Sequence, residues 1–488
     1  MKETLAGLPL SPLEVLLVAA AVALVLARWL PAGARRPVTI AAAALFLASG
    51  AASGVIGARW HLLPVFAGAA AALPFALAPL LPRRGGRAPR RARWWLALPG
   101  SALCLALIAT GPVASWALPV PVFPEPSGQF PVGTAVLELT DPGRPEPATA
   151  APDDRRTVVV QLWYPAGDSP AGNPRARYLG ATEREARIVS DGLAAYSGAP
   201  GFILDGLGRA RTHAVPGAPV AGRGGRFPVV LFSPGLGGVR TQNTAWAEEL
   251  ASHGYVVAAV EHPYDSAAVL LADGRVVRTR VGSSGDDAED ERRAAGWTAV
   301  RAADLSFVRA ELGRIARGEA AGPLTGRLDT DRVAAAGHSL GGGAALQAAR
   351  QDPGFAAVID LDGFPHDPAP APYPQPVLAL TQEIGPATDP DYLPKLTRVL
   401  DLGTATGYRL TVPGAAHLTF TDAPLFLPPV PSLVGSLGRA ESVRTTTAPC
   451  LAFLDAVLRD GGGDLPAALS AYGELSVHRP GGGRRPVR

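Results

Sequence analysis

Apolar residues form four long runs near the start of the chain. The runs cover residues 11–30, 38–58, 61–82 and 95–118, and each is about as long as a helix that crosses a bilayer. Glu14 is the only acidic residue within them. A cleaved signal peptide is the competing interpretation of the first run, but three further runs follow it. The pattern therefore predicts an all-α region of four transmembrane helices over residues 1–118.

Arginine is distributed unevenly among the segments that join these runs. Arg28, Arg35 and Arg36 lie between the first two runs, whereas the second loop carries only Arg59. The third loop carries Arg83, Arg84, Arg87, Arg90, Arg91 and Arg93. Because cytoplasmic loops are enriched in Arg and Lys, the first and third loops are expected inside the cell. This places the N-terminus and everything after residue 118 outside the cytoplasm, on a multi-pass anchor in the cell membrane.

A change of pattern after residue 118 predicts a linker and then a globular domain. Residues 119–154 are rich in proline, which indicates an extended linker with one short strand at Pro131–Leu139. Residues 155–462 alternate short apolar runs with amphipathic segments, and residues 463–488 are expected to form a C-terminal tail. The expected strands are Thr157–Trp163, Pro228–Phe232, Tyr255–Val260, Arg332–Ala336, Ala356–Ile359, Pro376–Leu380 and Tyr408–Val412, with helices at Thr244–His253 and Thr298–Arg317.

Strands that alternate with helices predict an α/β domain with a doubly wound, mostly parallel sheet. Residues from Pro263 to Gly296 interrupt the alternation and include an acidic run from Asp286 to Glu291. This segment is expected to be a solvated loop.

The strongest chemical motif is Gly337-x-Ser339-x-Gly341, which lies between an apolar strand and a helix rich in Ala and Gly. This is the nucleophile-elbow pattern of the α/β-hydrolases, in which a serine sits on a sharp turn from strand to helix. Small residues two positions on either side allow strand and helix to approach. The helix N-terminus offers backbone N–H groups to an oxyanion. Ser339 is therefore the predicted nucleophile.

A serine nucleophile needs a histidine base and a carboxylate, which follow it in the order acid then histidine in α/β-hydrolases. Three histidines follow Ser339. His366 lies in a loop rich in Pro and Asp, and His478 lies in the expected tail. His417 follows a strand within a turn of small residues, so it is the predicted base. His338 neighbours the nucleophile and must point elsewhere, whereas His253 and His262 precede the motif and are expected to be structural or to line the pocket.

Spacing alone does not identify the catalytic acid or the second oxyanion donor. Asp360 and Asp362 follow one strand, and Glu383 follows the next. The N–H of Leu340, directly after the nucleophile, is one expected oxyanion donor. The second should come from the loop after Pro228–Phe232. Its Pro234 has no N–H, so Gly235 or Leu236 must donate.

Several longer stretches resemble a known family. They are residues 232–267 (FSPGLGGVRTQNTAWAEELASHGYVVAAVEHPYDSA) and 331–347 (DRVAAAGHSLGGGAALQ), Trp163-Tyr164-Pro165, Arg301-x-x-Asp304-x-x-Phe307-Val308 and Gly414-x-x-His417-x-x-Phe420-x-Asp422. Together they resemble the platelet-activating factor acetylhydrolases of the plasma, isoform II type, over roughly residues 155–460. The resemblance implies an α/β-hydrolase with a Ser–Asp–His triad and neither metal nor cofactor. Such enzymes cleave short or oxidised acyl chains from phospholipids and other esters.

The resemblance also selects one residue among the candidate acids and one among the candidate oxyanion donors. The family's acid lies in a segment that corresponds to Leu361-Asp362-Gly363-Phe364, which implies Asp362. Its second oxyanion donor lies between the glycines of G-x-G, which implies Leu236. The sequence departs from the family at Pro234, where histidine is common.

The amino-acid composition indicates membrane segments and argues against some classes of partner. Charged residues make up 18% of the 488 residues and hydrophobic ones 48%, which indicates membrane segments rather than an ordinary soluble protein. The net charge is only +3. The arginines cluster between apolar runs and are not interleaved with aromatics, so a nucleic-acid partner is not expected. No Cys/His spacing predicts a metal site.

The sequence thus predicts a membrane-embedded serine esterase that acts on a lipid or small ester. Phe420, Leu425, Phe426 and Leu427, which follow His417 in the chain, are candidates to line an acyl pocket or a lid. A cutinase-like, polyester or short-chain esterase is the first alternative, and an inactive hydrolase-fold binding protein is the second.

Overall fold

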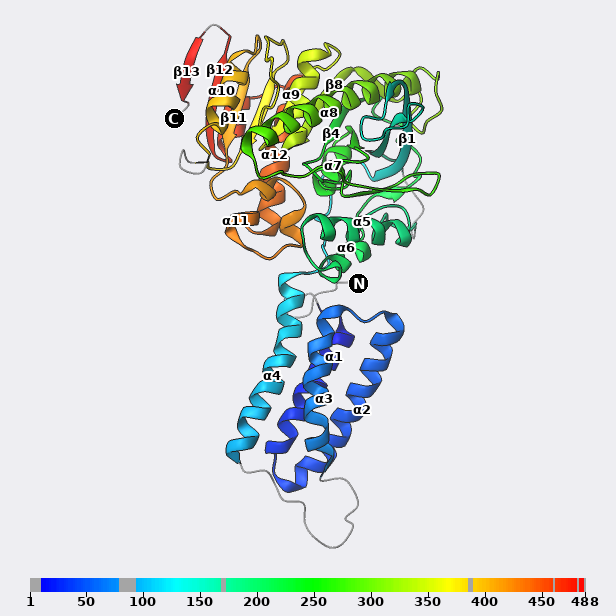
Figure 1. Ribbon diagram of the computed structural model, residues 1–488, viewed down its shortest axis with the longest axis vertical. Coiled ribbons are helices and arrows are strands. Elements are labelled where there is room, and N and C mark those ends of the chain that lie inside the picture. The colour runs from blue at the N-terminus through cyan, green and yellow to red at the C-terminus, as the bar shows by residue number, and fades with distance from the viewer. Residues whose placement is uncertain are drawn as a thin grey trace. The chain divides into compact units, whose positions relative to one another are not determined.

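The chain divides into two compact units, Met1–Val120 and Pro121–Arg488. The computed structural model describes residues 10–78, 94–167, 173–384, 389–459, 461–480 and 482–486. Figure 1 traces the helical first unit in blue to cyan and the second unit, which mixes helices and strands, in colours that end in red.

The first unit contains four helices, α1 (Pro12–Leu26), α2 (Ala32–Ile56), α3 (Leu63–Leu77) and α4 (Trp94–Ala117), with short 3-10 turns at Ala27–Trp29 and Trp60–Leu62. Within the described ranges four helices are long and apolar enough to cross a membrane, which confirms the expected all-α region.

The boundaries of two of these helices differ from the sequence expectation. Helix α2 begins at Ala32, so Arg35 and Arg36 lie in its first turns rather than in a loop. An arginine there keeps its charge near the membrane surface because its long side chain reaches outward. The end of the third run, residues 79–82, and the arginines of the third loop lie outside the described residues.

Glu14, the only acid in the four runs, has partners in the structure. Ser11 caps α1 and forms a capping box with Glu14. The Arg59 Nε donates to Glu14 Oε1 at 2.7 Å, and His61 Nε2 lies 3.4 Å from the same oxygen. The sole arginine of the second loop is therefore paired with an acid, which lowers the positive charge at that end of the bundle.

The second unit is built on one large sheet. Among the described residues eleven strands join it in the order β13-β12-β11-β10-β9-β8-β4-β5-β2-β1-β3. The central strands β5, β4, β8, β9, β10 and β11 are parallel, whereas β2 and β1 at one side and β12 and β13 at the other add antiparallel pairs. Figure 1 shows β12 and β13 at one edge and β1 toward the other. The strands are β1 (Val132–Pro145), β2 (Arg155–Pro165), β3 (Val215–Pro216), β4 (Phe227–Ser233), β5 (Val256–Glu261), β8 (Leu328–His338), β9 (Ala357–Leu361), β10 (Val377–Thr381), β11 (Gly407–Thr411), β12 (Glu474–Arg479) and β13 (Gly482–Pro486).

Helices cover both faces of this sheet, as its buried strands require. Alternate residues of each strand point to opposite faces, so Val229 and Leu231 of β4 join one core cluster while Val230 and Phe232 join another. The first cluster includes side chains of α8 (Asp287–Ala316), α9 (Leu340–Gln351) and α10 (Tyr392–Asp401), and the second includes those of α7 (Thr244–Ser252) and α12 (Arg439–Leu458). The doubly wound α/β fold class is confirmed.

The remaining helices of the second unit are short or peripheral. They are α5 (Glu183–Tyr196), α6 (Asp205–Arg209), α11 (Pro431–Val434) and α13 (Leu465–Ser470), with 3-10 turns η4 (Gly201–Leu204), η5 (His417–Phe420) and η6 (Ala423–Leu425).

Three segments contain more regular structure than expected. The linker holds the whole of β1, which extends beyond the expected strand Pro131–Leu139 and pairs with β2 from Val132↔Pro165 onward. The expected loop at 263–296 holds the hairpin of β6 (Ala268–Leu270) and β7 (Val276–Arg278) and the first turns of α8, which Asp286 caps by accepting from the Glu289 amide. The acidic run thus favours a helix N-terminus, where negative charge is stabilised. In the expected tail, buried Leu475 and Val477 anchor β12 to the sheet.

Candidate active site

Ser339 occupies a strained turn between β8 and α9. Its backbone has φ 56° and ψ −126°, a positive φ that is rare for a residue other than glycine. The neighbouring glycines permit this turn because of close approach. A Cβ on Gly337 would lie 2.1 Å from the Gly341 carbonyl oxygen, and a Cβ on Gly341 would lie 2.0 Å from the Ser233 carbonyl oxygen. The motif therefore folds as a nucleophile elbow for a steric reason.

His417 and Asp362 form a direct pair. The Nδ1 of His417 lies 2.7 Å from Oδ2 of Asp362. Because an ionised carboxylate only accepts hydrogen bonds, this contact assigns the proton to Nδ1 and leaves Nε2 free to accept one. The imidazole is 42% exposed, whereas the Asp362 side chain is 1% exposed. The ring is thus accessible to a reacting group while its partner is shielded from water.

Asp362 is held by further donors from the adjacent strand end and from α10. Its Oδ1 accepts from the Gln382 amide at 3.0 Å and from the Tyr392 hydroxyl at 3.2 Å. Its Oδ2 also accepts from Gln382 Nε2 at 2.8 Å. Burial and then the nearby charge of Asp362 raise the pKa of Tyr392 well above its usual value, so this phenol keeps its proton and donates it. The Asp362 backbone has φ 52°, a second left-handed residue in the site.

The two other candidate acids lie elsewhere. Asp360 is fully buried in β9 and accepts from the Gly363 amide at 2.8 Å. Burial, and then the charge of Asp362, raise the pKa of Asp360 well above its ordinary range. Glu383 accepts from the Gly414 amide at 3.2 Å, in the turn before His417. Neither carboxyl group is a hydrogen-bond partner of the His417 ring in the described part of the chain.

His338, the neighbour of Ser339, supports the backbone at His417. Its Nε2 lies 2.9 Å from the His417 carbonyl oxygen, and its Nδ1 lies 3.1 Å from Gln242 Nε2. The two imidazole rings have centroids 4.6 Å apart. Burial, and then His417, lower the pKa of His338 well below its usual value. His338 is therefore a neutral ring that donates to the His417 carbonyl, in agreement with the expectation that it points away from the nucleophile's chemistry.

The loop after β4 offers one amide to the pocket. The Gly235 amide donates to Gln242 Oε1 at 3.1 Å, so it is engaged inside the protein. Among the described residues, the Leu236 amide has no hydrogen-bond acceptor. The Leu340 amide lies in the first turn of α9, where the N–H groups of a helix have no partner within the helix.

Arg301 of α8 holds the carbonyl side of the same loop. Its guanidinium is 1% exposed, donates to the carbonyl oxygens of Pro234 and Gly235, the latter at 3.0 Å, and pairs with Asp265 at 2.7 and 2.6 Å. The partner carbonyls point toward α8, so the peptide planes of the loop are fixed by a buried charged group. Arg301-x-x-Asp304 is one of the stretches that resemble the family, but no role for Arg301 was predicted from the sequence.

A buried, hydrogen-bonded Ser–His–Asp alignment was not foreseen from the sequence. Ser233 Oγ is 3.0 Å from His262 Nε2, and His262 Nδ1 is 2.8 Å from Asp304 Oδ2. Ser233, His262 and Asp304 are each fully buried. Asp304 also accepts from Arg156 at 2.6 Å. Burial acts to raise the pKa of Asp304, but the charge of Arg156 and the hydrogen bond with His262 outweigh it and lower that pKa below its usual value. The alignment has no access to solvent, and His262 is structural, as the sequence analysis expected.

All five residues selected from the sequence line one cavity of about 450 Å³. They are Leu236, Ser339, Leu340, Asp362 and His417. The rest of the lining mixes aromatic and polar groups: Glu291, Ala294, Trp297, Phe364, His366, Gln382, Ile384, Asp389 and Tyr392.

The apolar part of this wall comes from residues that the sequence analysis missed. Trp297 lies on α8, and Phe364 follows β9 directly after Asp362 and Gly363. The expected pocket residues are placed differently, because Phe420 and Leu425 are buried at 0% and 5% exposure and Phe426 lies 6.3 Å from the Tyr178 ring. The unbroken helical pattern across residues 287–316 was the missing signal for Trp297.

Two residues of one cavity wall, Glu291 and His366, form a hydrogen-bonded group with Lys395. His366 Nδ1 lies 3.1 Å from Glu291 Oε2, and Lys395 Nζ donates to Glu291 Oε1 at 3.3 Å. Lys395 also lies over the Phe364 ring at 4.5 Å. Burial lowers the pKa of His366. Polar and aromatic groups therefore meet at this wall.

Comparisons with known proteins place these features in context. Residues 119–278 match the family model for platelet-activating factor acetylhydrolase, isoform II. A probable 1-alkyl-2-acetylglycerophosphocholine esterase of Arthroderma benhamiae is 28% identical over 50% of this chain and 59% of its own length. A platelet-activating factor acetylhydrolase of Cavia porcellus is 29% identical over 42% of this chain and 50% of its own. The chain thus spans little more than half the length of these curated relatives.

A solved structure matches a larger share of this chain than these curated relatives do. A ferulic acid esterase from Streptomyces cinnamoneus is 32% identical, covers 71% of this chain and 94% of its own, and superposes with a TM-score of 0.57.

Proposed function

Because residues 119–278 match the family model for platelet-activating factor acetylhydrolase, isoform II, and the similar proteins are esterases and acetylhydrolases, we propose that the chain is a membrane-anchored serine carboxylester hydrolase of this family. The observation that carries this proposal is the 2.7 Å pair of His417 and Asp362, which shares a cavity with Ser339 on its strained elbow. The names of the matched family and of the similar proteins support ester hydrolysis, and the residues assigned to it here follow the matched range 119–278 in the chain.

In the proposed reaction Ser339 Oγ attacks the ester carbonyl while His417 Nε2 takes the hydroxyl proton. The Asp362 carboxylate holds His417 in the tautomer that leaves Nε2 unprotonated, and it stabilises the imidazolium that forms. His417 then returns the proton to the leaving alcohol, and an acyl-enzyme remains. Water, activated by the same imidazole, attacks the acyl-enzyme and releases the carboxylic acid.

The amides of Leu236 and Leu340 are the proposed oxyanion donors. The Leu340 amide is the first of α9, so the helix dipole adds to its attraction for a negative charge. The Leu236 amide belongs to the loop whose carbonyls Arg301 fixes. Preorganised donors of this kind contribute about 10²–10³ each in rate.

Short or oxidised acyl chains of phospholipids, or of other lipid esters, are the proposed substrates. The names of the curated relatives support this class, since they are acetylhydrolases and an esterase of an acetylated glycerophosphocholine. A membrane anchor keeps the enzyme at the surface where such lipids are found.

An aromatic or polymeric ester is the second candidate. It is favoured by Trp297, Phe364 and Tyr392 in the cavity wall and by the name of the ferulic acid esterase. A cutinase-like activity on polyesters uses the same residues. An inactive hydrolase-fold binding protein is the remaining alternative.

Labelling by a fluorophosphonate probe tests the enzyme proposal directly. We expect the full chain in detergent to be labelled and Ser339→Ala to remain unlabelled. An unlabelled wild type, or equal labelling of the variant, would remove the enzyme proposal. A panel of p-nitrophenyl esters of rising chain length, a short-acyl phospholipid, a feruloyl ester and a polyester film would then rank the substrate classes.

The hydrolase unit is proposed to lie outside the cytoplasm. The first loop region carries Arg28, Arg35 and Arg36, whereas the single arginine of the second loop, Arg59, is paired with Glu14. The charge asymmetry therefore favours a cytoplasmic first loop. Protease treatment of intact cells tests this, because an extracytoplasmic unit is digested and a protected one would reverse the orientation.

A further inference from the structure

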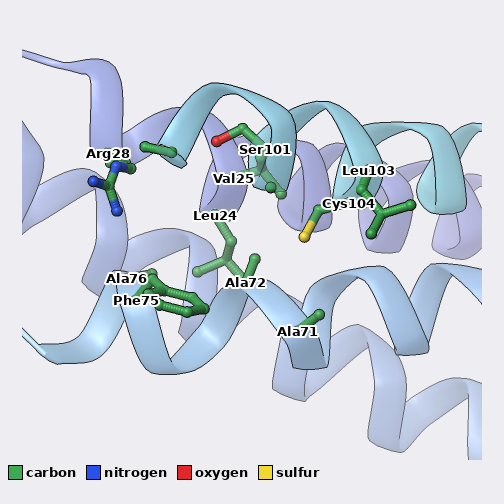
Figure 2. A pocket seen from close by; sticks show the side chains of 12 residues that line it. Leu24, Val25, Arg28, Ala71, Ala72, Phe75, Ala76, Ser101, Leu103 and Cys104 are labelled. Atoms are coloured by element: carbon green, nitrogen blue, oxygen red, sulfur yellow. The ribbon is translucent and has the colours of Figure 1, made fainter. Parts of the chain in front are cut away.

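A cavity of about 390 Å³ lies within the helical unit, between α1, α3 and α4. Figure 2 shows Arg28 at one end of it and Ala71, Leu103 and Cys104 toward the other. Apart from Arg28 and Ser101 its lining is apolar: Leu24, Val25, Ala71, Ala72, Phe75, Ala76, Ala97, Gly100, Leu103 and Cys104.

The helix packing explains why the cavity lies where it does. Helices α3 and α4 are in close contact farther along, where a Cβ on Gly68 would lie 2.8 Å from the Cys104 carbonyl oxygen. A Cβ on Gly111 would likewise lie 2.8 Å from the His61 carbonyl oxygen. Toward the Arg28 end the facing residues are alanines and Gly100, whose Cβ would meet nothing within 4 Å. The small side chains there leave the space unfilled.

The cavity opens toward the lipid phase. Phe75 and Leu103, which both line it, are each 63% exposed in the helical unit. An apolar cavity of this size binds apolar ligands rather than water. In a bilayer the apolar ligand at hand is a lipid acyl chain, which can enter sideways between the helices.

The polar groups at one end match a lipid head. Arg28 is a cation in the 3-10 turn Ala27–Trp29 directly after α1, and Ser101, which lies within α4 (Trp94–Ala117), lines the same cavity. The Ser101 hydroxyl accepts from Trp29 Nε1 at 3.2 Å and still has a proton to donate to an ester carbonyl. Basic groups at the ends of transmembrane helices attract anionic lipid phosphates.

We propose that this cavity binds one acyl chain of an anionic phospholipid, with the lipid phosphate against Arg28. The site is separate from the Ser339 cavity and lies wholly within the helical unit. Its occupant is a lipid of the leaflet that faces the first loop. The interaction does not depend on whether the second unit hydrolyses esters.

Photo-crosslinking of the full chain in vesicles tests the proposal. The probes are phosphatidylglycerol and phosphatidylcholine, each with the same diazirine-bearing acyl chain. We expect the phosphatidylglycerol probe to label peptides of α1, α3 and α4 that line the cavity. Label spread evenly over the outer faces of all four helices, including α2, would mean ordinary boundary lipid and would overturn the proposal.

Two matched variants separate the cavity from the helix surface. Gly100→Leu places a side chain in the cavity, and we expect it to lower labelling of the lining peptides severalfold. Gly54→Leu on α2, where a Cβ also meets nothing within 4 Å, should leave labelling unchanged. Wild-type labelling in Gly100→Leu would contradict the assigned site.

The head-group contact has its own test. Arg28→Gln should reduce the preference for phosphatidylglycerol over phosphatidylcholine about fivefold, whereas Arg28→Lys should retain it. Equal labelling by the two lipids in the wild type would refute the role of Arg28. Unlabelled lining peptides together with crosslinks between two copies would assign the cavity to a second chain, and the lipid proposal would fall.

Discussion

The charge state of Asp360 in the folded protein can be tested, and it distinguishes this residue from Asp362. Asp360 lies in β9 with 0% exposure, and its Oδ1 accepts from the Gly363 amide at 2.8 Å. Its Oδ2 is buried without a hydrogen-bond partner among the described residues. Burial and the neighbouring Asp362 charge raise its pKa, so we expect Asp360 to be a neutral acid in the folded protein at neutral pH.

The change Asp360→Asn keeps the shape of the side chain and removes its titration. In the unfolded wild type the carboxyl ionises near its usual pKa of about 3.9, while the folded form keeps the proton. The unfolded state therefore binds fewer protons above that pH, and the free energy of unfolding of the wild type falls as pH rises toward the folded-state pKa. The maximum slope for one group is about 1.4 kcal/mol per pH unit.

Asparagine does not titrate, so the free energy of unfolding of Asp360→Asn has no such dependence on pH. Relative to the wild type, it should therefore rise by about 1–3 kcal/mol between pH 5 and pH 7. The extra buried N–H of the amide adds a penalty of about 1–3 kcal/mol, but that penalty is the same at both pH values. The pH dependence of the difference is therefore the quantity that reports the charge of Asp360.

Urea unfolding of the full chain in detergent, followed by tryptophan fluorescence at several pH values, measures this difference. Esterase activity of Asp360→Asn should stay within about tenfold of wild type, whereas Asp362→Asn should lose about 10⁴ in kcat because the histidine tautomer is no longer held. Parallel stability curves for wild type and Asp360→Asn would show that the folded protein holds Asp360 ionised. A dead Asp360→Asn would make it the acid of the reaction.

Three further substitutions test the elbow, the oxyanion loop and the remaining carboxylate. Gly341→Ala puts a Cβ 2.0 Å from the Ser233 carbonyl oxygen, so we expect fluorophosphonate labelling to be lost. Gly222→Ala, which meets nothing within 4 Å, is the control, and normal labelling of Gly341→Ala would refute the steric argument. Arg301→Lys removes the guanidinium that donates to both the Pro234 and Gly235 carbonyl oxygens. We expect kcat for p-nitrophenyl acetate to fall about 10²-fold with KM little changed. An unchanged kcat would remove the positioning role. Glu383→Gln should retain activity within a few-fold, and its loss would move the acid to Glu383.

Much of the fold could be predicted because its strands are buried and short. Phe227–Ser233 and Val256–Glu261 are buried along their whole length, so their apolar runs stood out from the sequence. β12 was harder, since Leu475 and Val477 alternate with polar residues beside Gly, Pro and Arg. Strand β1 was only partly foreseen because its second half is exposed and reads as a proline-rich linker.

In the site, too, features set by neighbouring residues could be predicted from the sequence, whereas contacts between residues distant in the chain could not. The elbow at Ser339 is local, because five consecutive residues dictate its geometry. The choice of Asp362 depended on resemblance, since spacing does not show that the side chains of Asp360 and Asp362 face different environments. The contacts of Arg301 with Pro234 and of His262 with Asp304 join residues far apart in sequence, which single-sequence reasoning does not detect.

The pairing of β11 with β12 has a consequence for the order in which the protein is made. β11 leads into the turn that carries His417, and one of its edges is covered by β12, from Gly407↔His478 to Thr411↔Glu474. About sixty residues separate His417 from β12 in the chain. During synthesis Ser339, Asp362 and His417, the proposed catalytic residues, all leave the ribosome before β12, while β11 still presents an unpaired edge. Such an edge is prone to pair with other chains, so a chain stalled in this interval carries all three proposed catalytic residues together with an edge that favours aggregation.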